Sequence, residues 1–500
     1  MAEAILIQPR TALTGSLVRM IPIGLLYAAS SAVQHGHSIK ILDCRLHPDS
    51  WPHELMALVT PLTRIVGVSV MTGVSILESL AVSRHVAQNF PWVKVVWGGP
   101  HVTFSPHGVI EDAPVDFLVR GYGAQAFCDL LEYLERGELD RLSEIPGLSW
   151  KDKAEQVHHN EVVPAFEFID YRDIPYHLIA DYTLYYHADA SEIVFPMYSV
   201  MGCPYSCGFC SSPALYGEFG NRWVPYPVEQ VVEHIRFVQE RYGATYIYFI
   251  DDDSFVDRRH VEALIDTIAA AGIEVKLGFR GARINELLGM DDDFLTRLAA
   301  AGTRTLHIGV ESGSDRILDL MGKNITVQQI LEVNRTLARH PEIMALYNFI
   351  VGYPTETMEE TLLTRDLILR LIEENPRCIV IPLNKPRPLP GTPLMELALQ
   401  HGYLPPKSLE EWGVYDVEST DYRPPWLSPE HDRFIRMMFL CMYFIDDKIF
   451  KFSSAAGPQR TLLRMAALLY KPLAMLRFRF GFDRLLIENR LYTWFNKVLS

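Results

Sequence analysis

Three cysteines within eight residues constrain this 500-residue chain more than any other feature of its sequence. They are Cys203, Cys207 and Cys210, in the spacing C-x3-C-x2-C, with an aromatic residue directly before the last cysteine. Iron–sulfur clusters are held by cysteine thiolates, usually four for a four-iron cluster. No fourth cysteine lies nearby, so the spacing predicts a 4Fe-4S cluster with one iron open to a small ligand. The alternative is a structural zinc loop, but closed zinc sites use four ligands, commonly as paired elements, and the chain has no second pair.

The cysteine loop closely resembles the cluster-binding loop of the radical S-adenosylmethionine (SAM) superfamily. In that family the open iron chelates the amino and carboxylate groups of SAM, and an injected electron cleaves SAM to a 5′-deoxyadenosyl radical. The resemblance therefore implies SAM as a cofactor. It also implies an electron donor, such as a flavodoxin or a ferredoxin.

The chain as a whole has the composition of an ordinary globular protein, with 49% hydrophobic and 21% charged residues. Its length leaves room for about three domains. Cys44, Cys128, Cys378 and Cys441 are single cysteines in apolar stretches, which is typical of core positions in a reducing compartment. The N-terminus lacks the pattern of a signal peptide and no apolar run reaches the roughly 18 residues of a membrane span, so we expect a cytoplasmic protein. The net charge of −15 argues against a nucleic-acid partner.

Residues 4–135 alternate between short apolar runs and helical patterns. The runs, which we expect to be strands, are 4–8, 39–43, 65–71, 93–97 and 117–119. Strands that alternate with helices at this spacing predict a parallel, doubly wound α/β sheet of the Rossmann-like type. Ligands on such sheets bind outside the carboxyl ends of the strands. Ser69 and Thr72, Gly98 and Gly99, and Gly121 follow three of these strands, and glycines there let a bulky ligand approach the backbone.

The same stretch resembles the cobalamin-binding domain that is fused to one large class of radical SAM enzymes. The resemblance covers residues 1–137 and is carried by Pro22-Ile-Gly24-Leu-Leu-Tyr, Gly36-His37, Ser69-Val-Met-Thr72 and Gly98-Gly99-Pro100-His101. It implies that Ser69, Thr72, Gly98 and Gly99 line the corrin and the nucleotide tail of cobalamin, with Gly121 at the next strand end. A dinucleotide site is not expected, because no G-x-G-x-x-G follows the first strand.

Two departures from the cobalamin-domain pattern affect what the resemblance implies. The D-x-H-x-x-G motif, whose histidine ligates cobalt in the methionine-synthase type, is absent from the first loop. We interpret His35 and His37 as surface or turn histidines, so cobalt should lack a protein histidine ligand. The family often has G-E-G-E after the fifth strand, whereas this chain has Gly121-Tyr-Gly123-Ala, which keeps the glycines and loses the acids.

A second β/α alternation begins at residue 193. It follows a poorly periodic segment, 138–192, that we interpret as a linker containing one small hairpin around Lys151. The expected strands are 193–200, 246–250, 275–279, 305–310, 346–351 and 378–382. Functional groups at the carboxyl ends of successive parallel strands are typical of a (β/α) barrel. Six strands fit the partial (β/α)6 barrel of the radical SAM family, which we expect over residues 193–400.

The strand ends of this barrel match the SAM-binding motifs of the family. The implied contacts are Asp251 and Asp252 at the SAM ammonium group, Arg283 at the carboxylate, Glu311 and Ser312 at the ribose hydroxyls, and Gly352 beside adenine. An arginine fork suits a planar carboxylate. No residue that orients or deprotonates the substrate can be named from the sequence.

The last hundred residues, 401–500, lose the β/α pattern and are expected to be mainly helical, over 409–414, 429–450 and 460–497. In related enzymes this region closes the barrel mouth and shapes the substrate pocket. From Lys448 to Ser500 there are ten Lys/Arg residues and two acidic residues. We favour a substrate lid here, with peripheral contact to the inner membrane through this basic region as the alternative.

These features together predict a cobalamin-dependent radical SAM enzyme that methylates an unactivated carbon of a bulky hydrophobic small molecule, such as an isoprenoid lipid or a tetrapyrrole. The first alternative keeps both cofactors but forms a ring without methyl transfer, as in the anaerobic magnesium-protoporphyrin ester cyclase. A non-enzymatic cobalamin sensor is disfavoured by the complete SAM motif set. Methylthio transfer is disfavoured because the N-terminal domain lacks a second set of cluster cysteines.

Overall fold

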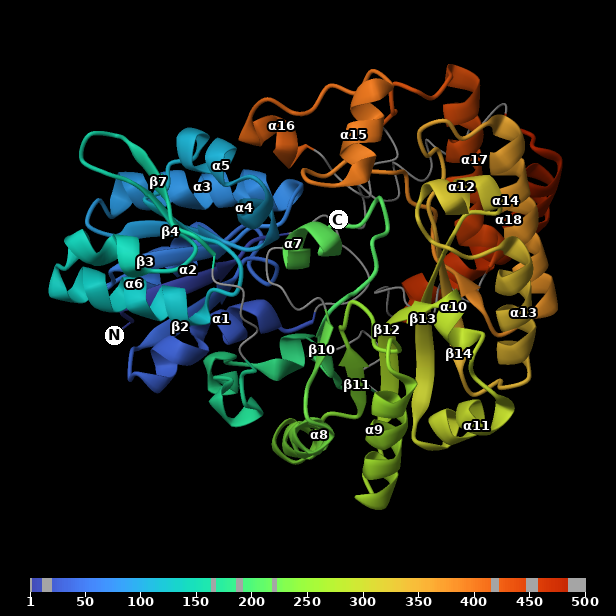
Figure 1. The fold of residues 1–500 in the computed structure, drawn as a ribbon, viewed down its shortest axis with the longest axis horizontal. Helices are drawn as coiled ribbons and strands as arrows, with labels where there is room; N and C mark the ends of the chain where they lie inside the picture. Colours follow the sequence, from blue (N-terminus) through green and yellow to red (C-terminus); the bar gives the residue numbers. More distant parts are fainter. Residues whose placement is uncertain are drawn as a thin grey trace.

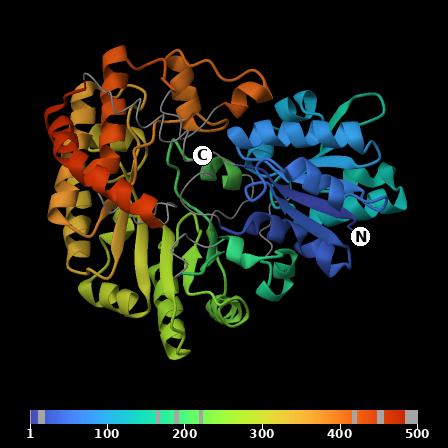
Figure 2. The ribbon, with the colours of Figure 1, turned by 180° about the vertical axis from the view of Figure 1, so that it is seen from behind.

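Two β-sheets, one in each half of the chain, form the framework of the structure (Figure 1). The computed structural model describes residues 2–10, 20–162, 168–185, 192–217, 223–414, 422–446 and 457–483. The N-terminal sheet with its helices lies beside the second sheet, and the C-terminal helices run over the top and the outer side of the second half (Figures 1 and 2).

The first sheet has seven strands in the order β2-β1-β3-β4-β5-β6-β7. Its strands are β1 (Ala4–Gln8), β2 (Ile39–Asp43), β3 (Ile65–Ser69), β4 (Lys94–Gly98), β5 (Phe117–Val119), β6 (Leu148–Lys151) and β7 (Val157–His159). The first five are parallel, and β6 and β7 continue the sheet as an antiparallel hairpin. The strand order reverses between β1 and β3, so the topological switch point lies there, where Gln8 and Ser69 end their strands.

Helices cover both faces of this sheet, which is why its parallel strands are nearly continuous apolar runs. The helices are α1 (Ile23–Gln34), α2 (Trp51–Leu58), α3 (Val74–Asn89), α4 (Pro100–Phe104), α5 (Pro106–Asp112) and α6 (Ala124–Arg136), followed by the 3-10 turn η2 (Leu139–Glu144). Alternate side chains of β1 enter different cores: Leu6 packs with α1 and α6, whereas Ile5 and Ile7 pack with α2 and α3.

The second sheet has six parallel strands in the order β15-β14-β13-β12-β11-β8. They are β8 (Val194–Met197), β11 (Tyr246–Phe249), β12 (Lys276–Arg283), β13 (Thr303–Glu311), β14 (Met344–Phe349) and β15 (Ile379–Val380). A short antiparallel ribbon, β9 (Val200–Gly202) with β10 (Trp223–Pro225), follows the first of these strands. The cysteine loop begins directly after this ribbon's first strand.

Amphipathic helices connect the six strands. They are α8 (Val228–Tyr242), α9 (Arg258–Ala270), α10 (Ile284–Leu287), α11 (Asp292–Ala300), α12 (Asp315–Leu320), α13 (Val327–Ala338) and α14 (Met358–Glu374), with α7 (Ser212–Gly217) after the cysteine loop. The sequence marks several ends: capping boxes start α13 at Thr326 and α14 at Thr357, and left-handed Gly243 ends α8. Three 3-10 turns, η3 (Tyr171–Asp173), η4 (Tyr176–Leu178) and η5 (Tyr182–Tyr185), lie between the two halves of the chain.

The C-terminal region contains α15 (Pro393–Gln400), α16 (Leu409–Gly413), α17 (Pro429–Ile445) and α18 (Gly457–Phe480). It contacts both halves of the molecule. α16 packs on α3 of the first half, where a Cβ atom on Gly413 would come within 2.4 Å of Leu77 and Arg84 pairs with Glu410 at 2.6 Å. α17 packs in the core of the second half. Within the described residues, no helix is both long enough and apolar enough to cross a membrane.

The fold class predicted from the sequence is confirmed: a doubly wound N-terminal sheet, a six-stranded parallel β/α sheet and a helical C-terminal region follow one another along the chain. The hairpin around Lys151 is also confirmed, but it extends the first sheet beyond the expected boundary at residue 137. The predicted helix 460–497 corresponds to α18, and its part beyond residue 483 lies outside the described residues.

Candidate functional site

A cavity of about 1370 Å³ lies between the two halves of the chain, at the carboxyl ends of both sets of parallel strands. Its wall includes the ends of β1, β3, β4 and β5 on one side and of β12 and β13 on the other, together with the cysteine loop. In each sheet these strands run parallel, so their carboxyl ends lie along one edge. The loops that follow the strands place polar side chains and glycines at that edge, which faces the cavity. The cavity therefore gathers most of the residues that the sequence singled out.

Cys203, Cys207 and Cys210 all line this cavity. The loop is held by a bond from Cys210 N to the Cys207 carbonyl at 3.0 Å, and by Ser212 N, which donates to the Cys210 sulfur at 3.4 Å. Thiolates on one zinc ion lie about 2.3 Å from it and so within about 4.6 Å of each other. The three sulfurs do not all lie within 4.8 Å of one another. This arrangement does not match three thiolates on a single zinc ion.

Burial raises the pKa of Cys203 to about 12 and also raises that of Cys210. The metal-free thiols are therefore favoured in their protonated form, and a bound cluster would have to displace these protons. Arg283 supplies a compensating charge, because its Nη1 lies 2.9 Å from the Cys207 sulfur. The same guanidinium lies 3.9 Å above the ring centre of Tyr205 in the cysteine loop.

The five residues expected to contact cobalamin all line the cavity. Ser69 ends β3, Thr72 follows it, Gly98 ends β4 and Gly121 follows β5. Gly99 has the clearest requirement for glycine: its φ is +100°, and a Cβ atom there would come within 2.9 Å of the Val70 carbonyl. Gly98 differs, since a Cβ atom there would meet only the Val119 carbonyl, at 3.4 Å. These five residues together form one edge of the cavity wall, at the carboxyl ends of β3, β4 and β5.

Three of the six residues expected at SAM also line the cavity: Asp252, Arg283 and Glu311. Glu311 is buried and pairs with buried Lys323 at 3.3 Å. Glu311 has a φ of +72°, a conformation uncommon for residues other than glycine. Lys323 was missed by the sequence reasoning, because it follows a short helix in Met321-Gly322-Lys323 and only the fold brings it to Glu311.

Asp251, Ser312 and Gly352 lie outside the lining of the cavity. Asp251 is fully buried and accepts hydrogen bonds from Ser199 N and Oγ, Val200 N and Ser254 Oγ. Burial raises its pKa to about 6, and these bonds oppose the rise. Its carboxyl thus holds the start of the β9 ribbon, directly upstream of the cysteine loop, to the end of β11.

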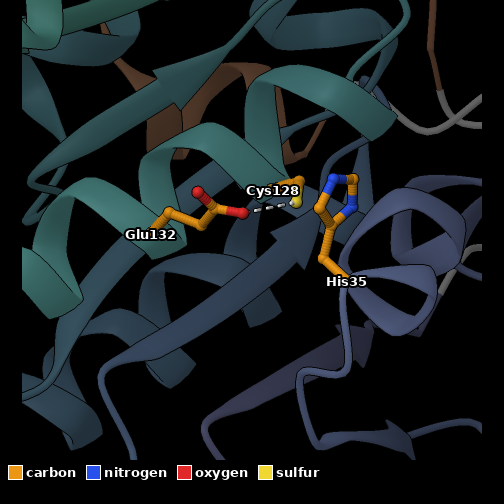
Figure 3. A group of neighbouring side chains, drawn as sticks. All are labelled: His35, Cys128 and Glu132. Carbon is orange, nitrogen blue, oxygen red and sulfur yellow. Dashed lines mark hydrogen bonds between the residues drawn. The ribbon is translucent and has the colours of Figure 1, made fainter.

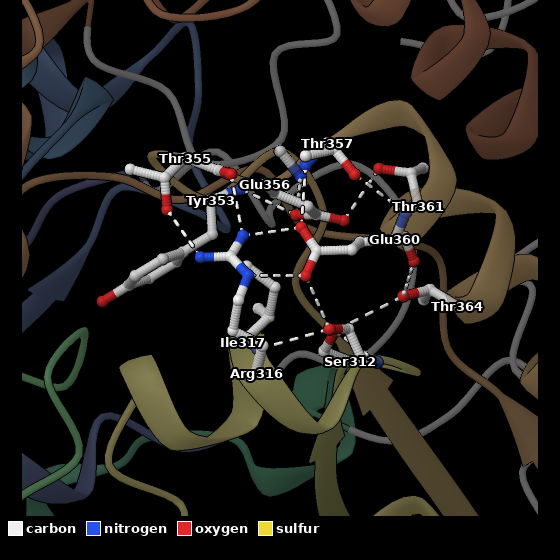
Figure 4. A network of polar contacts seen from close by, with 12 residues as sticks. Ser312, Arg316, Ile317, Tyr353, Thr355, Glu356, Thr357, Glu360, Thr361 and Thr364 are labelled. Carbon is white, nitrogen blue, oxygen red and sulfur yellow. Dashed lines mark hydrogen bonds and ion pairs between the residues drawn. The ribbon is translucent and has the colours of Figure 1, made fainter.

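A polar network supports Ser312 and the loop that follows β14 (Figure 4). Glu360 of α14 binds Arg316 bidentately and accepts from Ser314, while Thr364 accepts from Gly313 N at 2.9 Å. These contacts fix the Ser312 turn against α14. Residues 312 and 352 therefore belong to the layer behind the cavity wall.

Glu356 organises the loop at Gly352. Its Oε2 accepts from Gly352 N at 2.7 Å and Tyr353 N at 2.9 Å, and Thr361 Oγ1 lies 2.8 Å from its Oε1 and 2.7 Å from His431 Nε2. Burial raises the pKa of Glu356 to about 7. Trp426 Nε1 donates to the Gly352 carbonyl at 2.8 Å. Trp426 and His431 of the C-terminal region thus stabilise the loop at Gly352.

His35 and His37 do not line the cavity. They stand at the turn before β2, at the amino ends of the strands and so on the opposite edge of the sheet. His35 lies in a group with Cys128 and Glu132 of α6 (Figure 3), in which one ligand atom from each residue lies within 4.8 Å of the others. The Nδ1 atom of His35 bonds to the Ser31 carbonyl at 2.8 Å. This group is separate from the cavity.

Two family models match the chain: the B12 binding domain over residues 10–131 and the radical SAM superfamily over residues 197–368. An uncharacterized methyltransferase of Pyrococcus horikoshii is 31% identical over 386 residues, which cover 77% of this chain and 79% of that protein. The anaerobic magnesium-protoporphyrin IX monomethyl ester cyclase of Cereibacter sphaeroides is 26% identical, over 56% of this chain and 45% of that protein.

Among solved structures, a similar fold occurs in the radical S-adenosylmethionine methyltransferase TsrM of Kitasatospora setae, determined with cobalamin and a 4Fe-4S cluster bound. The TM-score is 0.64 at 20% identity, and the match covers 80% of this chain and 78% of that one. The two matched family models correspond to the two sheets, and the cavity lies where they meet.

Proposed function

Because the chain belongs to the B12-binding radical SAM methyltransferase family, we propose that it methylates an unactivated carbon atom of a bulky, largely apolar small molecule. The observation that carries this proposal is the single cavity, whose wall includes the cysteine loop, the strand ends of the cobalamin-binding domain and the strand ends of the SAM barrel. A substrate in that cavity would face both cofactors.

The donor set in the cavity fits both cofactors of the family. We assign the cluster to Cys203, Cys207 and Cys210, and cobalamin to the edge formed by Ser69, Thr72, Gly98, Gly99 and Gly121. When bound, the cluster supplies the electron that cleaves SAM, and cobalamin supplies the methyl group. The protein's own part is to orient the three ligands and to exclude water from the space between its two halves.

We assign the SAM side of the cavity to Asp252, Arg283 and Glu311. Arg283 is held beside Cys207, so a cation stands next to the place where SAM's carboxylate is expected. Lys323 neutralises Glu311 within a buried pair. Asp251, Ser312 and Gly352 support this arrangement from the layer behind the wall, through the bonds to Ser199, Thr364 and Glu356.

Methyl transfer is favoured over ring formation by the extent of the similarity. The chain aligns with 79% of the P. horikoshii methyltransferase but with only 45% of the ester cyclase. The substrate class that we propose is supported by the cavity wall, which contains Tyr27, Tyr198, Tyr226, Met201 and Leu215. Such a wall suits an isoprenoid lipid or a tetrapyrrole.

The electron donor we propose is a flavodoxin or a ferredoxin. This proposal rests on the radical SAM chemistry of the family, in which an injected electron cleaves SAM.

Peripheral contact with the inner membrane, from the cytoplasmic side, is the second partner that we propose. Helix α18 exposes a set of large apolar side chains: Met465, Leu468, Leu469, Leu473, Leu476 and Phe480. Leu469 is 82% exposed and Phe480 is 74% exposed. The spacing of these residues places them along one side of the helix, and Lys471 and Arg479 lie among them. An apolar stripe with basic neighbours suits the surface of an anionic bilayer.

Mass spectrometry tests the function directly. Extracts of a strain with and without the gene are compared after growth on methionine with a trideuterated methyl group. We expect one small molecule to carry the label only when the gene is present. A product that differs by a new ring and carries no label would instead support the cyclase reaction.

A further inference from the structure

Seven cationic side chains line the cavity, and six of them have partners within the described residues. Arg45 pairs with Asp43, Arg120 donates to the Asn160 carbonyl, Arg283 donates to Cys207, Lys323 pairs with Glu311, Lys385 pairs with Asp432, and Arg387 lies over the ring of Tyr422. Arg280 forms no hydrogen bond or ion pair with any described residue, and its side chain is exposed. One guanidinium in the cavity wall is therefore left for a ligand.

Arg280 stands among polar groups from neighbouring strands of the barrel. Burial raises the pKa values of Tyr198 and Tyr248 to about 12, and the positive charge of Arg280 opposes this rise in both. The Tyr248 hydroxyl lies 3.3 Å from His307 Nε2. Burial, assisted by the charge of Arg280, lowers the pKa of His307 to about 4, so this imidazole is neutral at physiological pH. His307 therefore adds hydrogen-bonding capacity beside Arg280 without adding a second charge.

Arg280 lies on the same strand as Arg283 but, among the described residues, forms no bond to the cysteines assigned to the cluster. Arg283 and Lys323 occupy the neighbourhood of Cys207, since Arg283 contacts both the Cys207 sulfur and the Lys323 carbonyl. Arg280 lies three residues earlier on β12 and is exposed, whereas Arg283 is buried. The strand ends assigned to cobalamin belong to the other sheet.

We propose that Arg280 binds an oxyanion of the substrate, a carboxylate or a phosphoryl group, and so selects amphiphilic substrates with an anionic end. A guanidinium presents paired N–H donors that match either oxyanion. Tyr198 and His307, which also line the cavity, offer further hydrogen bonds beside it. The apolar body of the substrate would then lie along the tyrosine and methionine wall. This inference rests on the proposed methyl transfer and narrows its substrate class.

The test uses anaerobically reconstituted enzyme with both cofactors, a chemical reductant, cell extract and SAM with a trideuterated methyl group. The parent is compared with Arg280→Ala and Arg280→Lys. Lys276→Ala is the matched control, because Lys276 is an exposed cation on the same strand that pairs with Glu192. The readout is labelled product per 5′-deoxyadenosine formed, together with retention of the product on an anion exchanger.

We expect the parent's product to be retained on the exchanger. We expect Arg280→Ala to lower the product ratio roughly tenfold to a hundredfold, the range for a lost hydrogen bond to a charged group. Arg280→Lys should fall between the two, and Lys276→Ala should match the parent. An iron content and a circular dichroism spectrum equal to those of the parent show that the variants are folded, and Arg280→Gln replaces Arg280→Ala if the latter is not.

Three results would overturn the assignment. A labelled product that the exchanger does not retain would exclude an anionic substrate. An unchanged product ratio with a weaker affinity for SAM would place SAM's carboxylate at Arg280. An unchanged ratio with a reduced corrinoid content would place the cobalamin phosphate there. If the parent forms 5′-deoxyadenosine but no labelled molecule at all, the proposed methyl transfer fails, and this inference fails with it.

Discussion

The guanidinium of Arg283 lies 2.9 Å from the sulfur of Cys207, which places a permanent positive charge beside one of the three cysteines that we assign to the cluster. Hydrogen bonds and charges near the ligating sulfurs are among the factors that set the potential of an iron–sulfur cluster. The sequence suggested that Arg283 meets the SAM carboxylate, and the contact with Cys207 gives it a second effect that can be measured without SAM.

Replacing Arg283 by alanine should make the cluster harder to reduce, because the added electron loses a nearby cation. We expect the midpoint potential to fall by roughly 60 mV, one tenfold step for a one-electron couple. Arg283→Lys keeps the charge and should shift the potential less. Redox titration followed by electron paramagnetic resonance measures both. Equal potentials in all three proteins would mean that Arg283 does not influence the cluster.

Alanine substitutions at Gly98 and Gly99 can be compared to test the cobalamin site that we propose at the carboxyl end of β4. Gly99→Ala should lose most of the corrinoid, because the new Cβ atom would press on the Val70 carbonyl at a φ of +100°. Gly98→Ala should lose less corrinoid, since its nearest protein contact would be at 3.4 Å. Absorbance of the purified proteins gives the corrinoid-to-protein ratio. The reverse order, with Gly98→Ala losing more, would contradict the role given to Gly99.

Both side chains of the Lys323–Glu311 pair are buried, so removing one partner should lower the free energy of unfolding. Lys323→Met leaves an unpaired buried carboxylate and should lower the free energy of unfolding by about 3–5 kcal/mol. Combining Lys323→Met with Glu311→Gln removes both charges and should recover much of that loss. Denaturant unfolding of the three proteins measures the difference. A double variant less stable than Lys323→Met would show that the pair matters through something other than charge.

Glu356 should make stability depend on pH near neutrality. Burial holds its folded pKa at about 7, above the ordinary value of 4.5, so the folded state favours the protonated form. Its contribution is fully present below pH 4.5 and is lost as the pH rises through about 7, to a total of roughly 3 kcal/mol. Glu356→Gln should lack this component. Thermal midpoints of parent and variant from pH 5 to 8 should therefore converge on the acidic side and separate on the basic side, with the variant higher.

The exposed stripe of α18 predicts binding to anionic vesicles. Leu469→Glu combined with Phe480→Glu should weaken co-sedimentation with phosphatidylglycerol vesicles about tenfold or more, because two large apolar side chains would no longer be buried in the bilayer. Leu404→Glu is the control, since Leu404 is 81% exposed but lies outside α18. If all three proteins bind equally, α18 does not mediate membrane contact.

Much of the fold could be predicted from the sequence because its parallel strands are buried on both faces and read as apolar runs. β11, for example, is an aromatic and β-branched run that ends two residues before Asp251. The sequence could not decide which carboxylate of Asp251-Asp252-Asp253 faces the cavity. That choice depends on Ser199 and Ser254, whose hydroxyls bind Asp251 behind the wall, and consecutive acids look alike in a sequence.

The role of a residue could also not be predicted from the sequence where it depends on a partner far away in the chain. Lys323 becomes informative only beside Glu311, and Arg280 only because the other cations of the cavity are paired. The site residues that the sequence did identify follow strands, where the regular β/α pattern fixes their place at the carboxyl edge. Charged residues inside a strand, such as Arg280, or in a loop between helices, such as Lys323, have no sequence pattern that fixes their place.

The packing of α16 on α3 has a consequence for how enzymes of this architecture could diverge. Gly413 sits against Leu77, and Arg84 pairs with Glu410, so a segment that follows the barrel in the chain is fastened to the first sheet. The spacing of the two halves, and with it the width of the cavity between them, then depends in part on a contact between residues outside the cavity lining. Lengthening or shortening the chain between α15 and α16 would change the size of the accepted molecule while leaving every lining residue in place.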